Sequence, residues 1–150
     1  MKNTISFNTK FGWISATEIN KKITKIQFNK VKKTGTPSKN LKNLQRNFYS
    51  YLQGNKKTIK APIEIIGNTM QKKIWNELKK IKKGKTRSYK EIAKKIGTSP
   101  RYIGRVCGEN QHVIIVPCHR VLRSNGEMGG FSGKGGVFLK KKLLRFENAI

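Results

Sequence analysis

Cys118 and His119 are the two neighbouring residues of this sequence best suited to nucleophilic chemistry. A cysteine becomes a strong nucleophile when a nearby base, positive charge or helix N-terminus lowers its pKa. Successive side chains of an extended segment point to opposite sides, so we expect His119 to act through a bridging water or a turn at Cys118. Glu147 is a candidate to orient the imidazole, as a third group does in such sites. The alternative is a buried structural cysteine.

The segment that must position these residues is the apolar run Val-Ile-Ile-Val at 113–116, followed by Pro117. An unbroken apolar run predicts a segment that is buried on both sides. Pro117 fixes its own φ and favours an extended conformation for Val116. The sequence therefore predicts a stiff, extended track that ends at the thiol.

Local signals in the first half predict a small sheet and one helix. Residues 4–29 read as a strand meander and residues 30–37 as a loop. Ser38 is a good N-cap for a helix over 39–52, which Gly54 ends. Residues 61–66 resemble an edge strand. We expect one subdomain over residues 1–65 and a second over residues 66–150.

The second half is predicted to be mostly helical. An apolar stripe between residues 70 and 81 indicates a first helix. A capping box of Ser88 and Glu91 starts a second helix that ends at residue 96. Ser99 and Pro100 start a third helix that ends near residue 108. Two short helices joined by a tight turn, the second basic at its start, are typical of a helix-turn-helix.

A glycine-rich loop after the Cys-His segment leads to a predicted last helix over residues 137–147. The lysines at 140–142 are expected to form its solvated face. Its packing residues are expected to be Val137, Phe138, Leu139, Leu143, Leu144 and Phe146.

Composition narrows the function classes. The chain has 34 Lys and Arg against 7 acidic residues, a formal net charge of +27, which favours nucleic acid as a partner. Part of this excess is a general drift of composition toward lysine. All acidic residues are glutamate, which excludes a Ser-His-Asp triad and argues against an Asp-rich two-metal nuclease. The cysteines and histidines, at 107, 118, 112 and 119, lack zinc-site spacing, so no metal is predicted.

Membrane and export signals are not evident in the sequence. No apolar run approaches the length of a membrane span, and the first residues lack the apolar region of a signal peptide. We therefore expect a cytoplasmic protein with reduced thiols and no membrane partner.

The segment Pro-Cys-His-Arg-Val at 117–121, with Asn110 eight residues before the cysteine, resembles the active-site signature of the O6-alkylguanine-DNA alkyltransferases, also called methylated-DNA–protein-cysteine methyltransferases. Residues 71–75, 84–89 and 99–101 resemble family segments before the site, and residues 129–133 and 143–147 resemble segments after it. The first 60 residues resemble the family more loosely. The resemblance implies an α+β fold, with a small ribonuclease H-like N-terminal subdomain and a winged helix-turn-helix-like C-terminal domain.

The function implied by the resemblance is DNA repair by irreversible alkyl transfer. Cys118 would take the alkyl group from O6-alkylguanine, and from O4-alkylthymine, in double-stranded DNA. Each molecule acts once, consumes no cofactor and works as a monomer. Because the target atom is inaccessible in a stacked duplex, the nucleotide must be flipped out.

The resemblance also implies roles for single residues. His119 would act as a base through water, and Glu147 would hold it. Tyr89 would donate a proton or hydrogen bond to the departing guanine. Asn110 would tie the recognition helix, which is the predicted helix that starts at Ser99 and Pro100, to the active-site segment at 117–121. The residues expected around the base are Val121, Phe131, Ser132 and Gly133, with the backbone N–H of Ser132 stabilising charge at O6.

Five residues are expected to contact DNA. Arg101 would enter the base stack and fill the gap that the flipped nucleotide leaves. Ser99, Tyr102, Arg105 and Arg120 are the other candidates. Tyr102 and Arg105 are bulkier than we would expect in a helix that reads the minor groove.

Three other functions remain open. A non-catalytic lesion binder would resemble the alkyltransferase-like proteins, but those lack the cysteine that this chain has. A Cys-His hydrolase of acyl groups would need a separate Asn or Asp to orient the histidine, and it leaves the helix-turn-helix without a role. A DNA-binding regulator with a structural cysteine is the third, although this chain has no extra cysteine-rich domain to sense damage.

Overall fold

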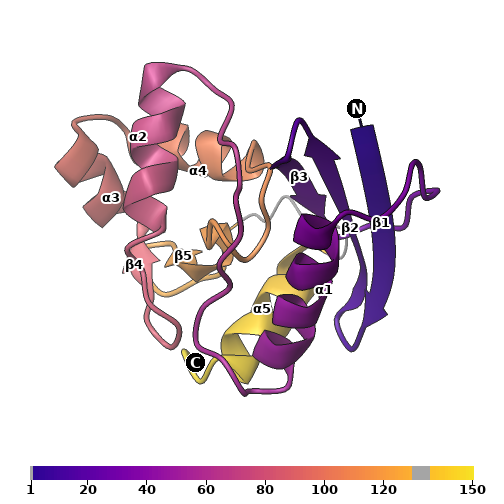
Figure 1. Ribbon diagram of the computed structural model, residues 1–150. Coiled ribbons are helices and arrows are strands. Elements are labelled where there is room, and N and C mark those ends of the chain that lie inside the picture. Colours follow the sequence, from indigo (N-terminus) through magenta and orange to yellow (C-terminus); the bar gives the residue numbers. More distant parts are fainter. Residues whose placement is uncertain (1, 130–135) are drawn as a thin grey trace. The chain divides into compact units, whose positions relative to one another are not determined.

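The computed structural model of the chain describes residues 2–129 and 136–150. The chain divides into two compact units, Met1–Ile66 and Gly67–Ile150. The described residues form a mixed α/β structure with a three-stranded sheet, a two-stranded sheet and five α-helices (Figure 1). No helix within the described part of the chain is long and apolar enough to cross a membrane.

The first unit contains an antiparallel sheet of β1 (Lys2–Thr9), β2 (Gly12–Ile19) and β3 (Lys22–Gln27), in that order. The turn between β2 and β3 consists of Asn20 and Lys21, both at positive φ. Two such residues match the right-handed twist of the flanking strands, which makes them a favoured hairpin connection. The predicted strand meander is confirmed.

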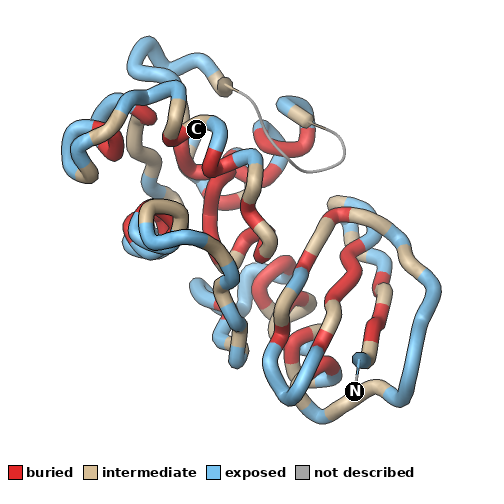
Figure 2. Tube along the Cα trace, turned by 90° about the horizontal axis from the view of Figure 1, so that it is seen from above, coloured by how far each residue is buried: buried red, intermediate tan, exposed pale blue. Residues whose placement is uncertain are grey.

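Helix α1 (Lys39–Leu52) packs on this sheet and has the bounds that the sequence predicts. Ser38 Oγ accepts a hydrogen bond from the Leu41 backbone N–H at 3.1 Å, which satisfies one of the unpaired donors at the helix start. The apolar stripe of α1 is buried, as the red segments of Figure 2 show. Its buried residues are Leu41, Leu44, Phe48, Tyr51 and Leu52.

Residues 61–66 are not the edge strand that the sequence suggests. Two backbone hydrogen bonds tie them to Ile23 in β3: Ile23 N–H donates to Pro62 O, and Glu64 N–H donates to Ile23 O, both at 2.9 Å. These bonds form a single parallel β-bridge, between Ile23 and Ile63, rather than a strand. Pro62 has no N–H to continue a ladder.

The second unit begins with α2 (Thr69–Leu78), followed by β4 (Arg87–Ser88) and α3 (Tyr89–Ile96). Helix α4 (Pro100–Gly108) follows a three-residue turn, and α2, α3 and α4 pack against one another. The predicted start and stop signals of α3 and α4 are confirmed. Ser88 and Glu91 form the capping box, and Ser99 Oγ caps α4. Gly97 ends α3 at φ +88, where a side chain would be strained.

A 3₁₀ turn, η1 (Cys118–Arg120), leads into the short strand β5 (Val121–Leu122). β5 pairs in parallel with β4, so that Arg87 lies opposite Val121 and Ser88 opposite Leu122. Because Ser88 also caps α3, this pairing brings the first residue of α3, Tyr89, next to the Cys-His segment. The last helix, α5 (Gly136–Phe146), packs against η1.

The apolar run before Cys118 is not extended, contrary to the sequence prediction. It folds into a tight turn, in which Ile115 N–H donates to Val113 O at 2.8 Å and Val116 N–H donates to His112 O at 2.9 Å. Ile114 lies at φ +70, a conformation that branched residues rarely adopt. The expected burial holds for Val113, Ile114 and Val116, which are at most 5% exposed, whereas Ile115 is half-buried. The thiol is therefore reached through a turn rather than from the end of a strand.

Helix α5 also differs from the sequence prediction. Lys140, expected on the solvated face, is 0% exposed, whereas Lys141 and Lys142 are exposed. Val137 and Phe138, expected to pack inward, are 46% and 71% exposed. Residue 140 precedes Leu143 and Leu144 by three and four positions, so helical periodicity places it on the buried face.

Candidate active site

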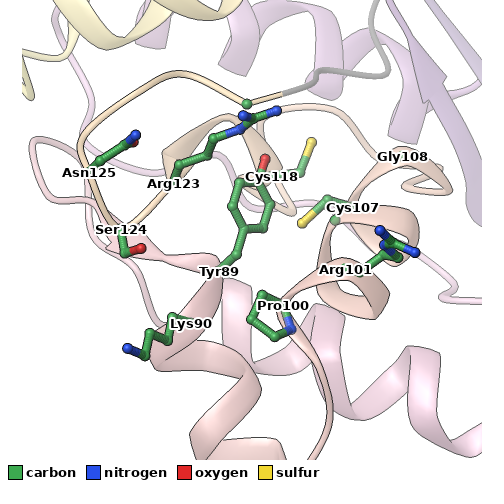
Figure 3. A pocket seen from close by; sticks show the side chains of 12 residues that line it. Tyr89, Lys90, Pro100, Arg101, Cys107, Gly108, Cys118, Arg123, Ser124 and Asn125 are labelled. Carbon is green, nitrogen blue, oxygen red and sulfur yellow. The ribbon is translucent and has the colours of Figure 1, made fainter.

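A cavity of about 740 Å³ lies in the second unit between α3, α4 and the segment after β5. This volume is in the range of pockets that hold drug-sized ligands. Figure 3 shows Tyr89 and the two cysteines, Cys107 and Cys118, lining it, and all three are buried. The exposed residues that line it include Lys90, Arg101, Arg123, Ser124 and Asn125.

Cys118 is the first residue of η1, and 3% of its surface is exposed. Asn110 Nδ2 lies 3.2 Å from the sulfur and 2.8 Å from Val116 O, so it donates to both. Asn110 Oδ1 accepts from the His112 backbone N–H at 2.9 Å. One amide thus spans both ends of the tight turn and points a donor at the sulfur. A donor of this kind stabilises a thiolate.

His119, Glu147 and Arg120 form a buried cluster behind the thiol. His119 Nε2 lies 3.0 Å from Glu147 Oε1. Arg120 Nε and Nη2 donate to Glu147 Oε1 and Oε2 at 2.9 and 2.8 Å, and Arg120 Nη1 donates to Ile81 O at 2.7 Å. Burial would raise the pKa of Glu147, but hydrogen bonds from His119 and Arg120 hold that pKa well below its usual range. Glu147 is therefore a carboxylate.

The same cluster keeps His119 neutral. Burial lowers the pKa of His119 and outweighs the opposing effect of Glu147, and the positive charge of Arg120 lowers that pKa further. A neutral imidazole that donates from Nε2 to a carboxylate carries its lone pair on Nδ1. This Nδ1 is buried and has no hydrogen-bond partner among the described residues. His119 is thus arranged to accept a proton at Nδ1.

The sequence predicts that Arg120 contacts DNA. The structure instead buries this residue away from the surface. It is 6% exposed and makes a two-pronged ion pair with Glu147. The positive charge of Arg120 adds to the effect of burial in lowering the pKa of His119. We therefore assign Arg120 to the cluster that keeps His119 neutral and withdraw the proposed DNA contact.

Tyr89, the first residue of α3, lines the same cavity as Cys118. Burial raises the pKa of its hydroxyl, so Tyr89 carries its proton at neutral pH. Gly129, at φ +66, lies so close to the ring that a Cβ there would come within 2.8 Å of Tyr89 Cε2. The hydroxyl oxygen accepts a hydrogen bond from Lys140 Nζ at 3.2 Å.

The other predicted DNA-contact residues lie on or beside α4. Arg101 and Arg105 are exposed, and Arg101 also lines the cavity. Tyr102 is half-buried beneath the Arg105 guanidinium, which lies 5.9 Å from the ring centroid. Ser99 is exposed, and its hydroxyl accepts from the Tyr102 backbone N–H.

Of the predicted base-pocket residues, only Val121 is described. It is fully buried in β5. Phe131, Ser132 and Gly133 lie outside the described residues. Within the described ranges, no group of three or more His, Cys, Asp or Glu side chains could hold a metal ion.

Lys140 and Cys107 are site residues that the sequence reading missed. The signal for Lys140 was its position on the stripe of residues 140, 143, 144 and 147, but a run of three lysines concealed it. The sequence offered no signal for Cys107 beyond its lack of zinc-site spacing. Burial and the nearby Cys118 raise the pKa of Cys107, so it stays a thiol.

Comparison with known proteins identifies the family. The family model described as 6-O-methylguanine DNA methyltransferase, DNA binding domain, matches residues 69–149, more than half of the chain. This chain belongs to the methylated-DNA–protein-cysteine methyltransferase family.

Relatives within the family match the chain to different extents. A methylated-DNA–protein-cysteine methyltransferase of Metallosphaera sedula is 33% identical over 97% of this chain and 92% of that protein. One of Sulfolobus acidocaldarius is 39% identical over 67% of this chain and 63% of that protein. The crystal structure of Mycobacterium tuberculosis OGT in complex with DNA has a TM-score of 0.85 and 26% identity, and the match covers 97% of this chain and 92% of that one.

Proposed function

We propose that this protein repairs alkylated DNA by transferring the alkyl group of O6-alkylguanine to Cys118. The observation that carries the proposal is the position of Cys118. Its thiol borders a cavity, Asn110 donates to its sulfur, and the neutral His119 follows it in the same turn. Family membership supports the same chemistry.

In the proposed reaction, the Cys118 proton passes through a water to His119 Nδ1, and Glu147 stabilises the resulting imidazolium. The sulfur then attacks the alkyl carbon, so an S–C bond forms as the bond from carbon to guanine O6 breaks. Tyr89 donates to the departing base as negative charge develops on it. The product is S-alkylcysteine, a thioether, and among the described residues of the site none is placed to cleave it. Each molecule therefore acts once.

Double-stranded DNA is the proposed partner, bound by the exposed face of α4. Arg101 stands at the rim of the cavity, where it would fill the gap left by a flipped nucleotide. We also propose O4-alkylthymine as a second substrate, and action as a monomer in the cytoplasm. By the family resemblance, the unit that contains α3 and α4 would be a winged helix-turn-helix and the other ribonuclease H-like.

The proposal is tested by weighing the protein after reaction. Mixed with excess duplex DNA that carries one O6-methylguanine, the wild type should gain a single methyl group, on the peptide that contains Cys118. Cys118→Ala should gain none. Cys107→Ala is the matched control, because it removes the other thiol of the same cavity and should still be methylated on Cys118.

Two outcomes would contradict the proposal. Repair of many lesions per molecule would point to a true turnover enzyme. Lesion binding without any transfer would favour the non-catalytic binder instead.

A further inference from the structure

The first unit carries a basic excess that the proposed repair site does not use. Residues 1–66 contain 14 Lys and Arg against 2 Glu, whereas α4 and the cavity belong to the other unit. Such an excess attracts polyanions in general, so charge alone indicates no particular ligand. Trp13 in β2 adds a more selective feature, because 37% of this residue is exposed.

Trp13 lies on the face of the sheet that points away from α1. The ring centroids of Phe7 and Phe48 in α1 lie 5.9 Å apart, and Phe7 pairs with Ile14 across the strands. Successive side chains of a strand alternate between its two faces, so Trp13 and its cross-strand partner Asn8 point to the opposite, outer face. The indole therefore lies outside the apolar core of the first unit.

The segment of residues 29–34, which follows β3, is held against this outer face. Ser6 lies on the outer face by the same alternation, and its hydroxyl accepts from the Val31 N–H and donates to Val31 O, both at 2.9 Å. Thr34 N–H donates to Thr4 O at 3.2 Å, and Thr4 N–H donates to Thr34 O at 3.0 Å. Two anchors thus give the backbone of this segment a defined path.

Three exposed lysines belong to this segment, Lys30, Lys32 and Lys33. Lys30 Nζ lies 4.6 Å from the centroid of the Trp13 ring. A cation over an aromatic face is attracted by the negative potential of the ring, so Lys30 helps to hold the indole in place. A ring that is already held loses little conformational freedom when a ligand binds to it.

The two acidic residues of the first unit lie away from this surface. Glu18 is buried on the side of β2 that faces α1. Glu64 N–H donates to Ile23 O, and Ile23 pairs with Glu18 at the end of β2, about 16 Å along the strand from Trp13. Within residues 2–66, the charged side chains around Trp13 are therefore basic.

We propose that Trp13 and the lysines of the 29–34 segment form a binding site for single-stranded nucleic acid. An unpaired base stacks on the exposed part of the indole, while Lys30, Lys32 and Lys33 bind the phosphates beside it. A duplex is a poorer ligand, because neighbouring base pairs cover the faces of its bases. This inference goes beyond the proposed function and does not depend on alkyl transfer to Cys118.

Tryptophan fluorescence tests the stacking directly. Trp75 is buried and its Nε1 donates to Val106 O at 3.1 Å, so a base from solution can stack only on Trp13. A short oligothymidylate should quench the emission of the wild type. Inorganic polyphosphate, which has the charges but no bases, should bind without this quench. Trp13→Phe should show no quench with oligothymidylate.

Affinities measured by fluorescence anisotropy separate stacking from charge. Trp13→Leu should weaken binding of oligothymidylate by about fivefold or more, the loss typical of one stacked base, and change duplex binding by less than about twofold. Lys30→Gln should reduce the slope of log affinity against log salt by about 0.7, the contribution of one phosphate of a single strand. Lys22→Gln is the matched control and should keep the wild-type slope, because Lys22 is exposed at the far end of the same sheet.

The inference is overturned if oligothymidylate leaves the emission unchanged, if polyphosphate or Trp13→Phe gives the same quench, or if Trp13→Leu binds oligothymidylate as the wild type does. Thermal unfolding checks each variant, and if Trp13→Leu does not fold, Lys30→Gln and Lys22→Gln decide.

Methyl transfer distinguishes this inference from the proposed function. Trp13→Leu should transfer the methyl group of saturating duplex DNA at the wild-type rate. A slower rate would place Trp13 in the repair reaction and overturn the inference. A wild type that never gains a methyl on Cys118 would refute the proposed function alone.

Discussion

His119 and Arg120 both bond to the carboxylate of Glu147. This arrangement affects the protonation state of His119. Glu147 alone would favour the charged imidazolium, which has no lone pair to accept a proton. Burial nevertheless lowers the pKa of His119, and the positive charge of Arg120, which pairs with the same carboxylate, lowers it further, so His119 stays neutral. In the proposed reaction, three consecutive residues, from Cys118 to Arg120, would thus supply the nucleophile, its base and the counter-charge of the group that orients the base.

At the same scale, Gly129 is predicted to hold Tyr89 in place. A Cβ at Gly129 would lie 2.8 Å from Tyr89 Cε2 and 2.9 Å from Tyr89 Oη, so Gly129→Ala must displace the ring. We expect the methyl-transfer rate to fall by roughly tenfold or more, since donor alignment is lost.

The control for this prediction is Gly126→Ala. Gly126 also has positive φ, at +87, but a Cβ there would meet nothing within 4 Å. Both variants should lose about 1 kcal/mol of stability from backbone strain, measured by urea unfolding. Only Gly129→Ala should slow transfer, and equal rates for the two would show that the contact with Tyr89 is unimportant.

At the scale of elements, Glu77 holds α2 to the elements that carry the site. Its carboxylate is 5% exposed and lies within 3.1 Å of three cations: Lys80, Arg87 before α3, and Lys95 within α3. Burial raises the pKa of Glu77, but hydrogen bonds from the three cations prevail and lower it from 4.5 to about 2.

This cluster predicts a specific acid sensitivity. Because the pKa of Glu77 is lower in the folded chain, its stabilisation is fully present above about pH 4.5 and is lost as pH falls toward about 2. Glu77→Gln should be less stable than the wild type at pH 7, and the difference in free energy of unfolding should shrink as pH falls from 5 to 2. Urea unfolding at each pH measures this. A difference that stays constant over that range would count against the cluster.

At the scale of the whole molecule, we expect the charge of +27 to affect the encounter with DNA rather than the chemical step. Binding that neutralises phosphates releases counterions, so affinity falls steeply with salt. If six or more phosphates are contacted, affinity for undamaged duplex should drop by roughly a thousandfold or more between 50 and 200 mM salt.

The methyl-transfer rate at saturating DNA should change little over the same interval, because the site groups are buried. Fluorescence anisotropy and single-turnover transfer measure the two quantities. If the saturating rate fell in parallel with affinity, the surface charge would have to participate in the chemical step.

Much of this protein could be predicted from the sequence, where the signals are local. The bounds of α1, α3 and α4 follow from Ser38, Ser88, Ser99 and Gly97, because caps and stops act on the backbone of their own turn. The resemblance around Cys118 likewise identified the family, which the comparisons show.

What only the tertiary structure decided is which polar groups lie inside. The turn at Ile114, the ion pair of Arg120 with Glu147 and the burial of Lys140 each depend on partners 27 to 51 positions away, or on a backbone conformation that the residue itself disfavours. No local pattern encodes the presence of a distant partner. A buried charge is tolerated only where the fold supplies a partner for it. The burial of these groups could therefore be recognised only from the structure, which shows which segments lie together.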